Sequence, residues 1–357
     1  MKGLVCPEKS FLIKIRFVNS ALETSNGVLT GGDLHAFGPS ARRALFLDRR
    51  MRRDLADSLR YIFNQASGQL AISEEPFQDF LCRLERHPVS PLAFSFYCDS
   101  VLAIEEDNVV EATRLLGDLI KLPAHPGGPV VIELADPGQD AVARRFVRFI
   151  DTDPTIEFEV FAPSSEAAGK CRALINGAFD LMNAGDPEQA DEIRALLREI
   201  VLAAGTKDPK ALTFDGASSF MLWGAIIINA NRRDGDLAMA QMLAHECSHN
   251  LLFGLCADGP LVENSDEEVY SSPLRIDPRP MDGIYHATFV TARMHRVVQR
   301  LLDSGVLSVP MQEKARKELA ENRRLFDQGI KVVRAHGKLT PLGEAIIQGA
   351  ENYMASV

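Results

Sequence analysis

The sequence lacks a long hydrophobic run and an excess of positive charge. Its apolar runs, such as that from Met221 to Ile228, are far shorter than the roughly 20 residues that a membrane-spanning helix needs. Lysine and arginine together number 39 against 49 aspartates and glutamates, which gives a formal net charge of −10. A basic footprint supplies most of the affinity for nucleic acid and for anionic lipid. We therefore expect neither nucleic acid nor a membrane as a partner.

Cysteine is also sparse, and no two cysteines stand close together in the sequence. The six cysteines are scattered along 357 residues without a CxxC motif, a distribution typical of reduced thiols. The apolar core of a secretory signal is missing as well, because Lys14 and Arg16 interrupt the stretch from Phe11 to Val18. The sequence therefore predicts a cytoplasmic protein.

The composition that is present is that of an ordinary globular chain, with 46% hydrophobic and 25% charged residues. Apolar residues recur with helical spacing along most of the chain, and a few short apolar runs have the length of strands. This spacing predicts helices over 42–66, 76–86, 91–104, 107–122, 139–150, 166–183, 187–204, 236–255, 283–302, 310–336 and 341–353. Short strands are expected over 130–134, 156–161 and 220–230.

These elements predict a mainly α-helical α+β fold with a small sheet. The proline- and glycine-rich segment 123–129 disfavours regular structure and is the best candidate for a linker. It would separate a helical N-terminal region over 1–122 from a second domain over 130–357. One continuous unit is the alternative.

The motif that carries chemistry is His245-Glu246-Cys247-Ser248-His249, an HExxH sequence inside the predicted helix 236–255. Residues four apart lie about 40° apart around a helix, so both imidazoles can bind one metal ion. Glu246 is turned about 100° from His245, where it can act as a general base or orient a ligand. An accidental match is expected in roughly one such sequence in a hundred. We therefore predict a metal-binding HExxH helix beside the small sheet.

A metal site needs a third protein ligand, and the spacing alone leaves several candidates. The long metzincin signature is excluded, because Leu252 and Leu255 stand where it requires glycine and histidine. A gluzincin would use a glutamate some twenty residues downstream. His286 and His295 lie nine residues apart in the predicted helix 283–302. Their side chains therefore face opposite sides of that helix, and at most one of them can reach the metal. The candidates are Asp258, Glu263, Asp266, Glu267, Glu268, His286 and His295.

The stretch from Phe214 to Leu302, about a quarter of the chain, resembles the HExxH-motif peptide-modification proteins. These include the α-ketoglutarate-dependent HExxH-type peptide β-hydroxylases of ribosomal peptide natural-product pathways. The similarity rests on three blocks: 214–219 (FDGASS), 243–249 (LAHECSH) and 270–287 (YSSPLRIDPRPMDGIYHA). The family reads S-P-W-R-x-D-x-R-P-x-x-G-x-x-H-G in the last block. Leu274 and Ala287 depart from its tryptophan and final glycine.

The resemblance implies a set of residues and cofactors. His286 would be the third ligand beside His245 and His249, the metal would be Fe(II), and α-ketoglutarate would be the cosubstrate. Such an enzyme hydroxylates the β-carbon of a residue in a precursor peptide. Arg275 and Arg279 are the candidates for binding the distal carboxylate, since guanidinium binds carboxylate bidentately. Salt bridges to the acidic loop 263–268 are an equally weighted role for either arginine.

Two other functions fit the motif. One is a zinc-dependent hydrolase of the gluzincin type, with Glu246 as base and Glu267 or Glu268 as third ligand. The other is a non-catalytic peptide-binding protein with a structural or degenerate site. The identity of the third ligand, histidine or glutamate, discriminates between the hydroxylase and the hydrolase.

Overall fold

The computed structural model describes two compact units. The described residues are 30–66, 68–150, 159–206, 214–232, 234–272 and 278–357. Within them, unit 1 contains 45–169 and 194–232, and unit 2 contains 30–44, 170–193 and 234–357. The division falls inside three helices, α3, α8 and α9, whose bounds are given next.

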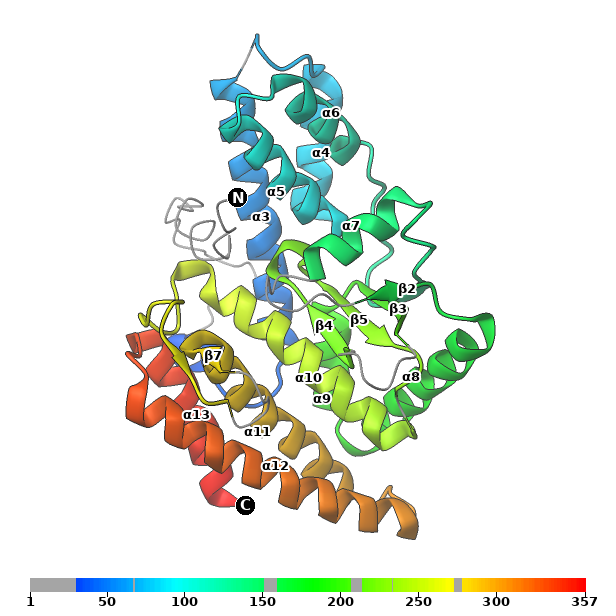
Figure 1. The fold of residues 1–357 in the computed structure, drawn as a ribbon, viewed down its shortest axis with the longest axis vertical. Helices are drawn as coiled ribbons and strands as arrows, with labels where there is room; N and C mark the ends of the chain where they lie inside the picture. The colour runs from blue at the N-terminus through cyan, green and yellow to red at the C-terminus, as the bar shows by residue number, and fades with distance from the viewer. Residues whose placement is uncertain (1–29, 67, 151–158, 207–213, 233, 273–277) are drawn as a thin grey trace. The chain divides into compact units, whose positions relative to one another are not determined.

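Most of the described chain is helical (Figure 1). The α-helices are α2 (Gly31–Leu34), α3 (Ala41–Gln65), α4 (Glu74–Arg86), α5 (Leu92–Glu105), α6 (Val109–Ile120), α7 (Ala141–Ile150), α8 (Ser165–Gly185), α9 (Pro187–Leu196), α10 (Asp236–Leu255), α11 (Met281–Asp303), α12 (Val309–His336) and α13 (Pro341–Ser356). The strands are β1 (Val130–Glu133), β2 (Val160–Phe161), β3 (Glu199–Gly205), β4 (Gly216–Ser218), β5 (Ala225–Asn229), β6 (Val269–Tyr270) and β7 (Arg279–Pro280). Two short 3-10 helices are η1 (Phe220–Leu222) and η2 (Cys256–Asp258). The predicted mainly α-helical α+β class is therefore confirmed.

Unit 1 contains a five-stranded mixed sheet. Strands β1, β3 and β5 are parallel neighbours, β4 pairs antiparallel with β5, and β2 pairs antiparallel with β3. Every residue of β3 and β5 is buried. Burial on both faces explains why these strands are continuous apolar runs without alternation. Trp223, just before β5, is 1% exposed and belongs to the core.

The prediction of a helix over 187–204 was wrong beyond residue 196. Helix α9 ends at Leu196, and the buried strand β3 begins at Glu199. A short apolar run buried on all sides has no periodicity that separates a strand from a helix. The predicted strand 220–230 is also shorter than expected, because η1 and Gly224, whose φ is +86°, precede β5. Strands β4, β6 and β7 were not predicted.

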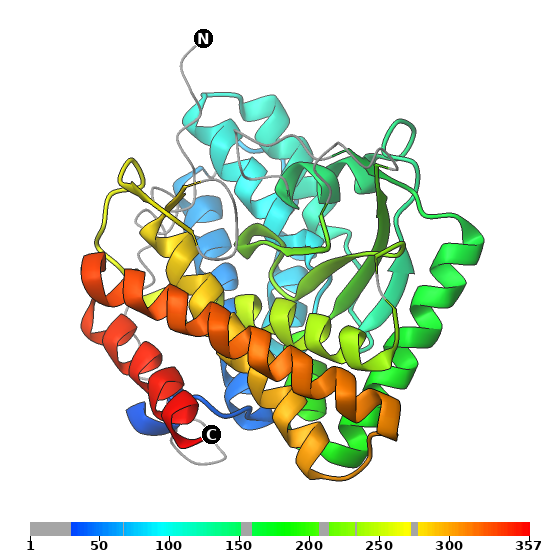
Figure 2. The same ribbon diagram turned by 60° about the horizontal axis from the view of Figure 1, so that its bottom comes forward.

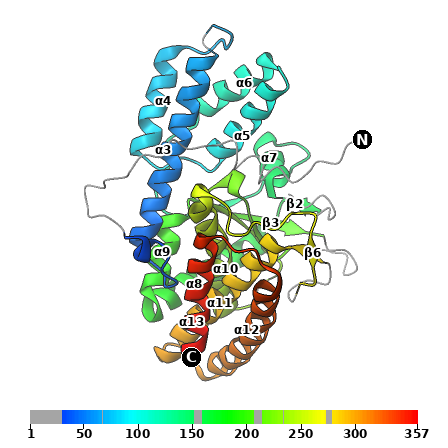
Figure 3. The same ribbon diagram turned by 90° about the vertical axis from the view of Figure 1, so that its left-hand side faces the viewer.

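Unit 2 is built around helices α10 to α13. Helix α11 packs against α10, α12 and α13, as the yellow to red ribbons of Figure 2 and Figure 3 show. Helix α10 is buried around almost its whole circumference, as expected for a core helix without a polar face. The exceptions include His245 and His249, which are partly exposed.

The described part of the chain contains no candidate membrane span and no disulfide among its own cysteines. None of its helices combines the length and the hydropathy that crossing a membrane requires. None of its five cysteines is joined to another in a disulfide: Cys82, Cys98, Cys171, Cys247 and Cys256. The division into domains at 123–129 remains a prediction.

Candidate metal centre

The HExxH motif lies in the middle of α10, as the sequence predicts. Its neighbours in the helix, Leu243, Ala244 and Leu251, are fully buried, so packing fixes the helix rotation. That rotation places His245 and His249 together on the partly exposed side. The two Nε2 atoms are 3.2 Å apart.

Helix α11 brings a third imidazole to this pair. The Nδ1 atom of His286 lies 3.2 Å from Nδ1 of His249, and the two rings are stacked with centroids 5.5 Å apart. His286 is only 8% exposed. The structure therefore brings together the three histidines that the sequence singled out, from two helices and across 37 residues of chain.

The separation of the first two nitrogens fits a shared ion. Metal–nitrogen bonds of about 2.0–2.1 Å, with angles between octahedral and tetrahedral, put two ligand nitrogens about 2.9–3.4 Å apart. The 3.2 Å between Nε2 of His245 and Nε2 of His249 lies inside this range. The Nδ1 atom of His286, in contrast, lies near Nδ1 of His249 and not near the Nε2 atom that faces His245. Within the described ranges, no group of three or more histidine, cysteine, aspartate or glutamate side chains is arranged to hold an ion.

The surroundings of the histidines favour neutral imidazoles. Burial lowers the pKa of His249 well below its usual range, and the neighbouring His245 and His286 lower it further. Burial also lowers the pKa of His286, against an opposing effect of Asp282. A metal binds only the neutral form of imidazole, so the donor set has the protonation state that a metal ligand needs.

Two further side chains lie near the ring of His245. The Oε1 atom of Glu246 lies 3.9 Å from Nε2 of His245, and the glutamate is 3% exposed. On the other side of that ring, Sδ of Met294 lies 3.1 Å from Nδ1 of His245. Sequence reasoning identified Glu246 but missed Met294, because spacing along one helix does not reveal which residue of another helix it meets.

Two of the competing ligand candidates, His295 and Glu268, have other side-chain partners. The Nδ1 atom of His295 lies 2.9 Å from the Tyr353 hydroxyl, which is on α13. The carboxylate of Glu268 accepts hydrogen bonds from Tyr270 and Lys338, at 2.7 and 3.1 Å. The backbone N–H of Glu267 donates to Ser265 at 3.3 Å. These contacts assign His295 and Glu268 to local structure.

Arg275 and Arg279 are the two arginines that the sequence offers for binding α-ketoglutarate. Arg275 lies outside the described residues. Arg279 lies in β7, is paired there with Tyr270 of β6, and directly precedes α11. It stands seven residues before His286 along the chain.

No protein-family model matches the chain, and no curated protein matches it in sequence. The likeness to the HExxH peptide-modification proteins therefore rests on the motifs alone.

Proposed function

We propose that His245, His249 and His286 hold one divalent metal ion in an Fe(II)- and α-ketoglutarate-dependent hydroxylase. Its substrate would be a side chain of a precursor peptide. The observation that carries the proposal is the position of His249, whose Nε2 lies 3.2 Å from Nε2 of His245 and whose Nδ1 lies 3.2 Å from Nδ1 of His286 on α11. Convergence on a single ion requires the ring of His286 to turn toward Nε2 of His249.

The choice of α-ketoglutarate follows from charge as well as resemblance. Three neutral imidazoles would leave both positive charges of the ion uncompensated and would leave coordination positions open for a cosubstrate. A dianionic 2-oxo acid fits both the charge and the open positions. When bound, the ion and cosubstrate would supply O₂ activation for hydroxylating a C–H bond.

The chain's own residues have assigned parts in this proposal. Arg279, and Arg275 beside it in sequence, would bind the distal carboxylate bidentately, as guanidinium does. Glu246 would orient the ligands and could hold a proton at Oε1, which lies beside Nε2 of His245. The partial exposure of His245 and His249 gives a cosubstrate access to the pair.

A second candidate function is a zinc-dependent hydrolase. The placement of Glu246, with Oε1 3.9 Å from Nε2 of His245, favours it, because a general base beside the metal-facing nitrogen is what HExxH hydrolases use. The contacts of Glu268 with Tyr270 and Lys338 weigh against the gluzincin ligand set. The third candidate is a non-catalytic peptide-binding protein whose site is structural or degenerate.

The test is visible spectroscopy of the purified protein without oxygen. Fe(II) is added first and α-ketoglutarate second. We expect a new charge-transfer band on the second addition, absent in His286→Ala and retained in His295→Ala, a matched histidine of the same helix. Zinc retention without any response to α-ketoglutarate would contradict the hydroxylase. Peptidase assays would then follow, with Glu246→Gln as the inactive control.

A further inference from the structure

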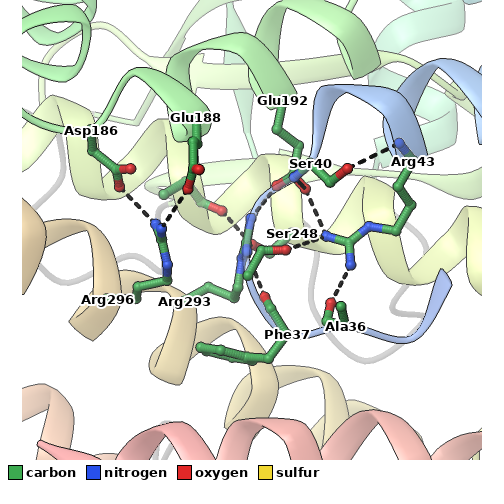
Figure 4. Close-up of polar contacts among 12 residues, drawn as sticks. Ala36, Phe37, Ser40, Arg43, Asp186, Glu188, Glu192, Ser248, Arg293 and Arg296 are labelled. Atoms are coloured by element: carbon green, nitrogen blue, oxygen red, sulfur yellow. Dashed lines mark hydrogen bonds and ion pairs between the residues drawn. The ribbon is translucent and has the colours of Figure 1, made fainter. Parts of the chain in front are cut away.

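A buried carboxylate forms ion pairs with two guanidiniums beside the HExxH helix (Figure 4). Glu192 of α9 accepts a hydrogen bond from Arg43 of α3 at 2.7 Å through Oε2, and another from Arg293 of α11 through Oε1. The side chains of all three residues are 0% exposed. We call Arg43, Glu192 and Arg293 the buried triad.

Backbone groups hold the rest of the triad. The Ser40 N–H donates to Glu192 at 2.8 Å. The two arginines donate to carbonyl oxygens of one loop: Arg43 to Ala36 and to Gly38, the latter at 2.8 Å, and Arg293 to Phe37 at 2.7 Å. Burial by itself would raise the pKa of Glu192, but the guanidiniums of Arg293 and Arg43 outweigh it and lower that pKa. The triad therefore stays charged.

The triad reaches α10 between the two histidines of the motif. The Nε–H of Arg293 donates to Oγ of Ser248 at 3.3 Å, and that hydroxyl donates to the Ala244 carbonyl at 2.6 Å. Ser248 precedes His249 directly. The contact therefore ties α11 to the very turn of α10 that carries the histidines.

The same side of α11 carries the third histidine. Arg293 follows His286 by seven residues, so the two side chains lie about 20° apart around the helix. His286 meets His249, Arg293 meets Ser248, and Met294 meets His245. These three contacts between the helices set how α11 lies against α10. Only the contact of Arg293 with Ser248 involves a charged side chain, and that side chain is held in place by the other residues of the buried triad.

A buried ion triad contributes little net stability, because desolvation offsets most of the attraction between its charges. What its directional bonds do supply is fixed geometry. The geometry points to Glu192 as a positioning residue for the proposed metal centre, acting through Arg293 and Ser248 on the approach of His286 to His249. This inference rests on the proposed metal site.

The variants are chosen with matched controls. Glu192→Gln removes the charge, and Ser248→Ala removes the contact with α10. Asp186→Asn is the control for Glu192→Gln. Asp186 is also 0% exposed and also binds an arginine of α11, Arg296, at 2.7 Å, but it lies at the α8–α9 junction and outside the buried triad. Ser100→Ala is the control for the second, since Ser100 is 0% exposed and donates to its own helix in α5.

Two readouts separate the positioning role from the metal itself. The first is Co(II) affinity, measured by competition with a chelator. The second is the imidazole ¹⁵N spectrum of the metal-free protein. We expect Glu192→Gln and Ser248→Ala each to weaken Co(II) binding about tenfold, as loss of an outer-shell contact does. Because both residues act through the same contact, the double variant should bind Co(II) about as weakly as the weaker of the two single variants. The Co(II) affinity of both controls should stay within about twofold of that of the wild type.

The outcomes are distinguishable. If the wild type binds no Co(II) but Glu192→Gln shifts the His249 and His286 resonances and Asp186→Asn does not, the positioning role stands and the proposed function fails. If the variants and their controls behave alike in both readouts, the positioning role is overturned. If Glu192→Gln does not fold, Ser248→Ala against Ser100→Ala decides the question alone.

Discussion

At the scale of single residues, two histidines of one helix have different surroundings although the sequence around them does not distinguish them. His286 and His295 share α11, yet His286 meets His249 while His295 meets Tyr353. Nine residues turn a helix by about half a revolution beyond two full turns, so the two rings point to opposite sides. The expectation that at most one of them joins the motif follows from helix geometry alone. Which one joins depends on what each side packs against.

The buried His295 should make stability depend on pH. Burial, followed by the charge of Arg323, lowers its pKa to about 4. The folded chain then takes up this proton only near pH 4, whereas the unfolded chain takes it up near 6.5. Between these values the unfolded state binds more protons, so acidification costs folding free energy, by up to about 3 kcal/mol at pH 4. The contribution is fully present above pH 6.5.

Urea unfolding at pH 7 and pH 4 measures this difference. We expect the wild type to lose up to about 3 kcal/mol more than His295→Gln between the two values. Equal losses in both proteins would show that His295 does not carry the pH dependence.

At the scale of elements, close helix packing depends on particular glycines. Gly329 of α12 faces α11, and a Cβ at that position would lie well under 3.0 Å from Oγ1 of Thr288. The Thr288 hydroxyl is held by its own helix, since it donates to the Ile284 carbonyl at 2.7 Å. An added methyl group therefore cannot be accommodated by a simple rotation of the threonine.

Gly329→Ala should destabilise the protein by about 1–3 kcal/mol, because overpacking outweighs the better helix propensity of alanine. Gly117→Ala in α6 is the matched control, since a Cβ there meets nothing within 4 Å. It should stabilise by about 0.5–1 kcal/mol. Thermal unfolding of both variants tests the pair, and a destabilisation of the same size in both would contradict the packing argument.

The elements also show what the sequence reveals and what it hides. Amphipathic spacing predicted most of the helices, because a single helix needs only local periodicity. Residues 199–204, which belong to β3, were misread as helix, because a strand buried on both faces shows no alternation. The two-residue strands β6 and β7 are too short to leave any periodic signal.

At the scale of the whole molecule, the site depends on contacts between distant parts of the chain. The HExxH pair is local and could be predicted from spacing. The approach of His286 was expected from a motif resemblance and not from any physical rule. The buried triad could not be foreseen, because 149 and 101 residues separate Glu192 from its two arginines and each residue alone reads as an ordinary surface charge.

The central claim is that three histidines bind one metal ion, and an equilibrium titration tests it most directly. Metal-free protein is titrated with Co(II), followed by its visible absorption. We predict one ion per chain, with loss of binding in His249→Ala and at least about a hundredfold weaker binding in His286→Ala, the removal of one of three ligands. His295→Ala should bind as the wild type does. Wild-type protein that takes up no ion, or His286→Ala that binds it unchanged, would contradict the account.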